Sequence, residues 1–358
     1  MPIEAELRAL RGAVALAAGA HVVCLRLSGE GAFDALGHVS SADLFLQDAQ
    51  MRPSLLLHED GVPFADVYVC RDDESFFLLS EGPTAPDLIA WLRAHLPPGA
   101  GAGVTIDDLG EDHAVLSLHG PYAWELLGEC LGPDLVGLPY LSFYRVPPRD
   151  AGEAAMLCFR AGKTGEYGYD LLVDRRHEAG LRARLEASGR AFDLGVASLD
   201  ALDQCALENG FFNIRREGRA GLTPLELQLQ WRTSYARSYV GADALRARRQ
   251  AGSTQRITHL VAAEPLAAGD AVLLDGAPIG ALLQAGASPL RGDWVGLALL
   301  DRPYAHVGVD RYAVARGGGL VPVRTLSPPL LDNRSLYVSP QRHGYRSRAG
   351  DAFAPLVP

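Results

Sequence analysis

The spacing of apolar residues along the chain predicts alternating strands and helices. Between residues 54 and 81, three apolar runs are separated by HEDGV and RDDES, two segments rich in turn-forming residues, so three strands are expected there. Residues 21–29 alternate between apolar and polar side chains, which predicts one more strand. Apolar residues recur at helical spacing in five further segments: 2–18, 85–96, 122–131, 177–189 and a stretch that begins near Val196.

The middle of the chain repeats this order of elements. Strand-like runs at 154–160 and 169–173 flank the turn AGKTGEYG, and a helical segment follows them. The sequence lacks the GxGxxG fingerprint and the crossover order of a dinucleotide-binding fold. The pattern therefore favours the α+β class.

The pattern changes after about residue 245. Short apolar runs are punctuated by Gly, Pro and Asp, as in AAEPLAAGDAVLLDGAPIGALLQ, and this predicts a small antiparallel β-barrel. We therefore expect a first region of residues 1–245, a barrel of residues 246–335 and an irregular tail of residues 336–358 that forms an extended arm.

Composition excludes several classes of partner. The chain has 358 residues and a formal net charge of -10, so it repels phosphate backbones and we expect no nucleic-acid partner. No apolar run reaches the roughly 18 residues that a membrane span requires. The five cysteines are scattered without a CxxC pair, and several lie in apolar contexts, so we expect buried thiols and a reducing, cytoplasmic setting. We also expect a monomer or a weakly associating dimer.

Common catalytic devices are absent from the sequence. The segment GKT at 162–164 resembles the end of a phosphate-binding loop, but the first glycine of that motif is replaced by Leu157. There is no HExxH, no GxSxG and no histidine cluster at metal-ligand spacing, so no metal site is expected.

Two carboxylates in apolar surroundings are the candidates for chemistry. Asp66 begins a predicted strand in PFADVYV, and Glu208 ends a predicted helix in QCALENGFF. A carboxylate at a helix C-terminus faces an unfavourable dipole, which a ligand that donates N–H groups would offset. The alternative for each residue is an ordinary solvated or capping acid.

A series of motifs favours a functional role for both carboxylates. RAGKTGEYGYDLLV resembles the signature RTGYTGExGYE of the aminomethyltransferase (glycine cleavage T-protein) family, ALENG resembles its LEAG, and LTPLELQLQW resembles its TPxExxLxW. LSLHGPYAWELL, YVGADAL and APIGALLQAGASPLRGDWVGLALL resemble further segments of that family in the same order. Single motifs are weak, but their order over roughly residues 21–330 is specific.

The resemblance implies a fold and a set of site residues. The fold is a cloverleaf of two interleaved α/β subdomains and a C-terminal barrel around a channel that holds tetrahydrofolate. By matching position, Glu208 would accept the ring N–H and the amino group of the pterin, and Asp66 would be the catalytic acid that handles a proton. Arg237 would neutralise the glutamate tail of the folate, unless it is a surface charge. Tyr169 and Trp231 would line the folate site, although Tyr169 is equally explained as an ordinary strand aromatic.

Departures from the family pattern concern the substrate. Lys163 replaces the signature tyrosine, Tyr167 replaces a small or acidic residue, Asn209 replaces Ala, and one acid of the usual pair is Ala65. The family also carries a further N-terminal segment ahead of the point where this sequence begins. We therefore expect a tetrahydrofolate-dependent transferase of a methyl, methylene or aminomethyl group that acts on a small molecule rather than in glycine cleavage.

Two alternatives remain open. One is a folate-binding accessory protein without turnover, as in relatives linked to iron–sulfur cluster maintenance. Those relatives carry a KGCYxGQE motif, whereas this chain has TPLELQLQW, which favours the transferase. The other alternative is a folate-independent enzyme on the same scaffold.

Overall fold

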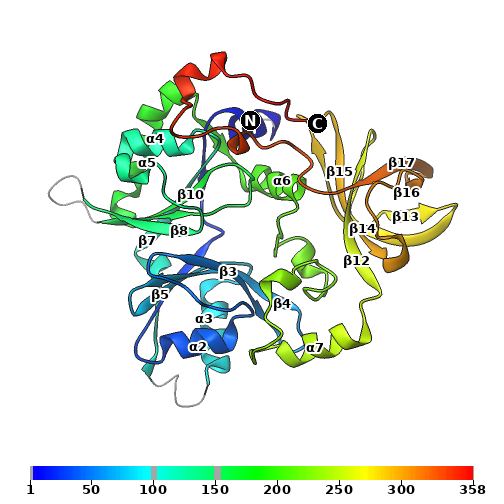
Figure 1. Cartoon of the computed structure of the whole chain (residues 1–358), viewed down its shortest axis with the longest axis horizontal. Coiled ribbons are helices and arrows are strands. Elements are labelled where there is room, and N and C mark those ends of the chain that lie inside the picture. Colours follow the sequence, from blue (N-terminus) through cyan, green and yellow to red (C-terminus); the bar gives the residue numbers. More distant parts are fainter. Residues whose placement is uncertain (1–2, 98–102, 149–154, 358) are drawn as a thin grey trace.

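Three β-rich lobes make up the molecule, as the computed structural model shows (Figure 1). The structure describes residues 3–97, 103–148 and 155–357. A six-stranded sheet forms the first lobe, a five-stranded sheet the second, and a closed six-stranded barrel the third. The helix α6 (Leu199–Asn209) lies between the first lobe and the barrel (Figure 1).

The first two lobes are interleaved along the chain. The chain enters the first sheet with β1 (Ala15–Ala18), builds the whole second sheet, and then returns to complete the first. In the second sheet the order is β3-β4-β5-β2-β6, with these strands: β2 (Val23–Ser28), β3 (Met51–Leu57), β4 (Pro63–Asp72), β5 (Ser75–Glu81) and β6 (Thr105–Asp108). The first sheet has the order β11-β1-β7-β10-β9-β8, with these strands: β7 (His113–His119), β8 (Ser142–Val146), β9 (Met156–Arg160), β10 (Gly168–Asp174) and β11 (Gly195–Ala197). The three strands expected within residues 54–81 are confirmed.

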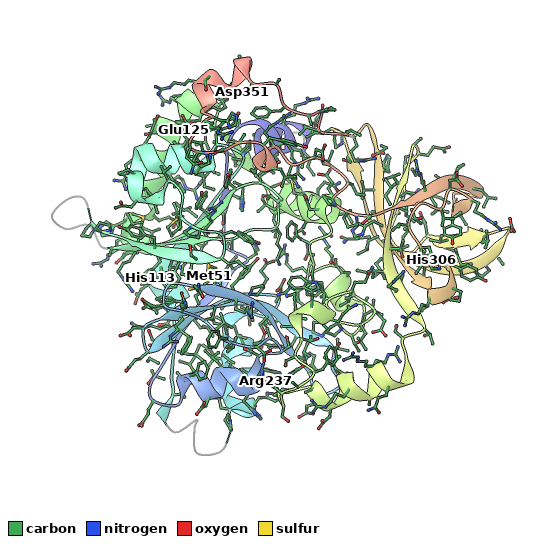
Figure 2. All side chains as sticks on the ribbon, in the orientation of Figure 1. Met51, His113, Glu125, Arg237, His306 and Asp351 are labelled. Carbon is green, nitrogen blue, oxygen red and sulfur yellow. The ribbon has the colours of Figure 1, made fainter. Side chains whose placement is uncertain are left out.

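The two sheets pack face to face, and helices cover their outer faces. Met51 lies in the layer between the sheets (Figure 2). Phe77 of β5 meets Phe143 of β8 and Phe159 of β9 edge to face, with ring centroids 5.8 and 5.9 Å apart. Such aromatic pairs add to the free energy gained by burying their area, and the two lobes share this apolar layer. The covering helices are α2 (Ala32–Val39) and α3 (Ala85–His95) on the second sheet and α4 (Ala123–Leu131) and α5 (Arg175–Gly189) on the first.

The N-terminal segment differs from the sequence expectation. The helix α1 covers only Ile3–Gly12, and Ala15–Ala18 is the strand β1 rather than the end of a helix over 2–18. β1 pairs with β7 on one side and with β11 on the other. These sheet hydrogen bonds override the helix propensity of alanine, which is a weak preference when tertiary pairing is available.

The barrel confirms the antiparallel C-terminal domain. Its strands are β12 (Gln255–Ala262), β13 (Ala271–Leu274), β14 (Ala277–Ser288), β15 (Asp293–Asp301), β16 (Tyr312–Arg316) and β17 (Gly319–Leu326), in the order β12-β15-β14-β13-β16-β17. The helix α7 (Ala242–Ala251) precedes the barrel, so a boundary between residues 245 and 246 would cut through this helix. All five cysteines are buried and free. No helix in the described part of the chain is long and apolar enough to cross a membrane.

The tail after the barrel folds back onto the first lobe instead of extending as an arm. Tyr345 is buried and packs against Tyr122 and Phe192 of that lobe. Glu166 accepts hydrogen bonds from the backbone N–H of Arg334 (3.0 Å) and of Ser335 (2.8 Å). The tail therefore ties the end of the barrel to the first lobe.

Candidate functional site

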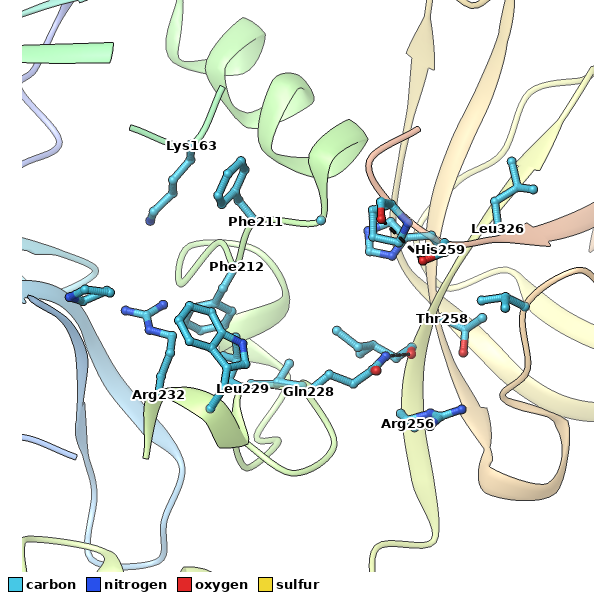
Figure 3. A pocket seen from close by; sticks show the side chains of 18 of the residues that line it. Lys163, Phe211, Phe212, Gln228, Leu229, Arg232, Arg256, Thr258, His259 and Leu326 are labelled. Atoms are coloured by element: carbon cyan, nitrogen blue, oxygen red, sulfur yellow. Dashed lines mark hydrogen bonds between the residues drawn. The ribbon is translucent and has the colours of Figure 1, made fainter. Parts of the chain in front are cut away.

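A cavity of about 350 Å³ lies where the three lobes meet. Its walls come from β3 and β4, the loop around Lys163, the chain after α6, the segment 227–232 and the barrel strand β12. The close-up shows Lys163 and Arg232 on one side of this cavity and Arg256 on β12 on the other (Figure 3). We call it the large cavity.

Positive charge and aromatic rings dominate the large cavity. The charged side chains that line it are Lys163, Arg232 and Arg256, and no Asp or Glu is among the described residues that line it. Its aromatic lining consists of Tyr68, Tyr140, Phe211, Phe212 and Trp231. Flat apolar walls with a few fixed polar groups are typical of small-molecule sites.

Asp66 lies behind this wall and is held by two cations. It is 5% exposed, and it forms ion pairs with Arg232 and, through Nζ at 2.8 Å, with Lys163. Burial raises the pKa of Asp66, but the two cations outweigh burial and hold it below its ordinary value. Asp66 is therefore a carboxylate at neutral pH and not a proton donor.

The position of Lys163 follows from the sheet register. Asp66 of β4 stands directly opposite Glu81 of β5, so two like charges face each other across neighbouring strands. The Nζ of Lys163 lies 2.8 Å from Asp66 and 2.7 Å from Glu81 and neutralises both. Burial lowers the pKa of Lys163, and the two carboxylates more than offset this, so the lysine stays an ammonium. It is the only lysine in the chain.

A second, small cavity of about 60 Å³ lies on the other side of Lys163. Tyr68 and Lys163 line both cavities. Many residues that line the small cavity are titratable or carry a hydroxyl group; besides Tyr68 and Lys163 they are His21, Glu81, Ser117, His119, Thr164, Asp170, Asp203 and Arg215. Burial and the neighbouring His21 lower the pKa of His119 to about 4, so this imidazole is neutral at pH 7.

Asp170 differs from the other carboxylates of the small cavity. Glu81 is paired with Lys163 and Arg215, and Asp203 is also paired with Arg215. Asp170 has no ion pair among the described residues. It accepts a 2.5 Å hydrogen bond from Ser117, its neighbour across β7 and β10. Burial raises the pKa of Asp170 to about 6, although the bond from Ser117 opposes this. Asp170 is thus a half-buried carboxylate that has no ion-pair partner among the described residues.

Glu208 is not where the resemblance implied. It is 1% exposed and lines neither cavity. Its oxygens accept hydrogen bonds from Arg11 (2.8 Å), Ser288 (2.6 Å) and Gln204 (3.3 Å). The unfavourable helix dipole at Glu208 is offset by a buried arginine rather than by a ligand, so the assignment of Glu208 to the pterin is corrected here.

The other three residues expected to bind folate lie in three different places. Tyr169 is 1% exposed in the core of the first lobe, so it is the ordinary strand aromatic that the alternative described. Arg237 lies near α2, away from both cavities (Figure 2). It pairs with Asp43 at 2.5 Å and donates to the carbonyl of Gly37. Only Trp231 lines the large cavity, where it is 71% exposed at the mouth.

Sequence reasoning missed Asp170 and misjudged Lys163. The signal for Asp170 was present, because the signature RTGYTGExGYE ends in an acid and Asp170 stands at that position. Its significance depends on the missing counter-charge, which only the structure shows. Among the described residues, no group of three or more His, Cys, Asp or Glu side chains could hold a metal ion.

Comparison with known proteins identifies the family. Residues 1–237 match the GCVT N-terminal domain, and residues 255–332 match the glycine cleavage T-protein C-terminal barrel domain. The chain therefore belongs to the glycine cleavage T-protein (aminomethyltransferase) family.

Curated relatives and a solved structure agree with this placement. An aminomethyltransferase of Frankia alni is 28% identical over 92% of this chain and 91% of its own. An aminomethyltransferase of Mycobacterium leprae is 29% identical over 91% of this chain and 88% of its own. One of Chlorobaculum parvum is 29% identical over 64% of each chain, just under two thirds of that relative. The crystal structure of glycine cleavage system aminomethyltransferase T from Bartonella henselae has the same fold, with a TM-score of 0.83 and 21% identity over 93% of this chain and 90% of that one.

Proposed function

We propose that this protein is a one-carbon transferase that uses a reduced folate and acts on a small molecule. The observation that carries the proposal is Asp170, a half-buried carboxylate without an ion pair to the described residues, in a small cavity that adjoins the large one. Membership of the family supports the use of folate.

Asp170 suits the hydrogen-bonding edge of a pterin. A 2-amino-4-oxopterin presents a ring N–H and an amino group side by side, and one carboxylate accepts both in a charge-assisted pair. Asp170 is suited to this role because its pKa of about 6 leaves it mostly ionised at neutral pH. Glu81 and Asp203 are unsuited because their charge is already neutralised by Lys163 and Arg215. When bound, a reduced folate would supply a nucleophilic ring nitrogen that carries the one-carbon unit.

The chain's own residues then have separate tasks. Asp170 would fix the orientation of the ring, which lowers the entropic cost of reaction. Asp66 would hold Lys163 and Arg232 in place on the wall of the large cavity, since it stays ionised and paired. The aromatic side chains of that cavity would exclude water from the apolar part of the ligand.

A small-molecule substrate is favoured by the charge of the site. Where the family signature has a tyrosine, this chain places an ammonium between Asp66 and Glu81. This change alters both the shape and the charge beside the reacting group, and specificity is a difference of affinities. A lipoyl-bound aminomethyl group, which is an amine, would meet cations on this wall.

We expect the protein to have no glycine cleavage activity at enzymatic rates. The test combines purified protein, tetrahydrofolate and aminomethylated lipoyl carrier protein, and follows ammonia and methylenetetrahydrofolate. A family member known to act in glycine cleavage serves as the positive control. The expected result is that tetrahydrofolate raises the melting temperature while ammonia release stays at background. Turnover on the order of 1 per second or faster would refute the small-molecule assignment.

A further inference from the structure

We propose that the C-terminal tail helps to form the proposed folate site, because Ser335 of the tail and Tyr167 position the wall between the two cavities. The wall is the loop of residues 161–167 between β9 and β10, which we call the cavity loop. The part of the tail that contacts it is residues 333–338, which we call the tail segment. The proposal rests on the proposed function and names positioning residues for the same site.

The cavity loop separates the large cavity from the small one. Gly162, Lys163 and Thr164 line the small cavity, and Lys163 lines the large cavity as well. The Nζ of Lys163 lies 2.8 Å from Asp66 and 2.7 Å from Glu81. Both carboxylates belong to the second sheet, whereas the cavity loop belongs to the first. The contact between the lobes therefore depends on where the backbone of the cavity loop is held.

The end of the cavity loop is hydrogen-bonded to the tail segment, which follows the barrel and lies over the first lobe (Figure 1). The backbone N–H of Tyr167 donates to the hydroxyl oxygen of Ser335 (2.9 Å), and the hydroxyl of Tyr167 donates to the carbonyl of Val338 (2.9 Å). Ser335 also donates to Glu166, through its backbone N–H (2.8 Å) and its hydroxyl (2.6 Å). Glu166 is buried, so losing these bonds leaves polar groups without partners where water does not replace them readily.

The middle of the cavity loop is enclosed by three other segments. The carbonyl of Thr164 accepts hydrogen bonds from Arg11 of α1 and from Asn209 of α6, the second at 2.9 Å. Asn333 of the tail segment donates to Asn209 (2.6 Å) and accepts from Arg11 (2.7 Å). A Cβ atom at Gly165, where φ is +79°, would lie 2.4 Å from Asn209 and 2.5 Å from Asn333. The tail segment is therefore in direct contact with the backbone that carries Lys163.

The same contacts account for two residues that depart from the family pattern, Tyr167 and Asn209. The sequence links both of them to the substrate, but neither lines the large or the small cavity. Tyr167 instead bonds the tail segment, and Asn209 bonds the backbone of Thr164. A third departure, Lys163, lies on the loop that these residues hold. The three departures act together, because the lysine bridges two carboxylates only when its loop is fixed.

Ser335→Ala tests the tail segment without changing a residue that lines either cavity. Protein grown with ¹³Cε-labelled lysine gives one side-chain signal by NMR, because Lys163 is the only lysine in the chain. In the wild type, Asp66 and Glu81 hold the pKa of Lys163 above its ordinary value. In Ser335→Ala we expect the signal at pH 7 to shift and the titration midpoint of Lys163 to fall toward its ordinary value, because the lysine moves away from these carboxylates.

Ser347→Ala is the matched control for this variant. Ser347 is an exposed serine of the same tail, and its hydroxyl donates only within its own turn, to the carbonyl of Gly344. Its lysine signal and titration should match those of the wild type. An unchanged lysine signal in Ser335→Ala, or an equal change in Ser347→Ala, would overturn the proposal.

Tyr167→Phe tests the cavity loop from its own side. This variant loses the bond to the carbonyl of Val338 and keeps the aromatic ring, over which the guanidinium of Arg160 lies at 4.9 Å. The lysine signal should change in the same direction as in Ser335→Ala, and by less, because one hydrogen bond is lost instead of two. Tyr144→Phe removes a 3.0 Å bond to Asp134 on the outside of the same lobe and should leave the signal in place. Should Ser335→Ala fail to fold, an unchanged signal in Tyr167→Phe would by itself overturn the proposal.

Calorimetry with tetrahydrofolate then relates the tail segment to the ligand. We expect Ser335→Ala to bind about tenfold more weakly than the wild type and Ser347→Ala to bind equally well, since a loosened wall must be ordered when the ligand binds. Wild-type affinity in a Ser335→Ala protein whose lysine signal has moved would reduce the tail segment to a support of the fold and overturn the proposal. If the wild type itself bound no tetrahydrofolate, the folate proposal would fail, and the lysine signal would still decide whether Ser335 and Tyr167 position the wall.

Discussion

Glu208→Ala is expected to lower the free energy of unfolding by about 3–5 kcal/mol, the usual cost of removing one partner of a buried ion pair. Arg11, which is 1% exposed, would lose the carboxylate at 2.8 Å and keep the carboxylate of Glu166 at 3.6 Å, together with uncharged acceptors on Thr164 and Asn333. The effect should be large because this pair joins three parts of the molecule. Arg11 belongs to α1 and Glu208 to α6, and Ser288 of the barrel donates to Glu208.

Urea denaturation followed by circular dichroism measures this loss. Glu178→Ala is the matched control, because Glu178 is partly exposed on α5 and pairs with Arg182 at 3.6 Å; its effect should stay below about 0.5 kcal/mol. If Glu208→Ala were as stable as wild type and had lost tetrahydrofolate binding, Glu208 would be a ligand residue after all and the structural role would be wrong.

Asp66→Asn should reduce turnover about 10²-fold, the scale observed when a positioned charged group is removed. The physical reason is that Asn cannot hold both Lys163 and Arg232, two residues that line the large cavity. The pKa of Lys163 should fall in this variant, because one of the two carboxylates that raise it is gone. Because Lys163 is the only lysine in the sequence, an NMR titration of protein grown with ¹³Cε-labelled lysine reports this change without a known substrate.

The pH dependence separates positioning from proton transfer. In the folded protein the pKa of Asp66 lies below its ordinary value, so Asp66 stays ionised as the pH falls to about 4. Between pH 5 and 8, the pH profile of wild-type turnover should therefore contain no ionisation step that is missing from the profile of Asp66→Asn. If the wild-type profile has an ionisation step in this range and Asp66→Asn lacks it, Asp66 is a general acid or base, as the resemblance implied. A fully active variant would remove Asp66 from the mechanism.

Local patterns predicted most of the fold. The three strands of residues 54–81 and the barrel have clear apolar runs separated by turn formers, and these are confirmed. The pattern failed at residues 15–18, where an alanine-rich segment pairs between β7 and β11. It also failed for the tail, whose burial depends on Tyr122 and Phe192 of a distant lobe. Both failures arise from contacts between segments far apart in the sequence.

The site was predicted less well than the fold for a physical reason. A motif match shows which carboxylates are present, but the chemistry depends on which of them are neutralised. Glu208 and Asp66 are both paired with buried cations, Arg11 and Arg232, that no local spacing connects to them. Asp170 matters because it lacks such a partner among the described residues, and that property belongs to the whole fold.

Calorimetric titration of tetrahydrofolate into the wild type and Asp170→Asn is the most direct test of the central claim, that Asp170 holds the pterin of a reduced folate. We expect one folate per wild-type chain and a Kd about 10- to 100-fold weaker in Asp170→Asn, because charge-assisted hydrogen bonds are lost. Since only the ionised carboxylate accepts both N–H groups and the pKa of Asp170 is about 6, wild-type affinity should also fall as the pH drops from 7.5 to 5, whereas the variant should change little. Ser117, Glu81 and Lys163 influence this titration, and none of them is altered in the variant. Equal affinity of the two proteins, or no binding by the wild type at saturating tetrahydrofolate, would contradict the account.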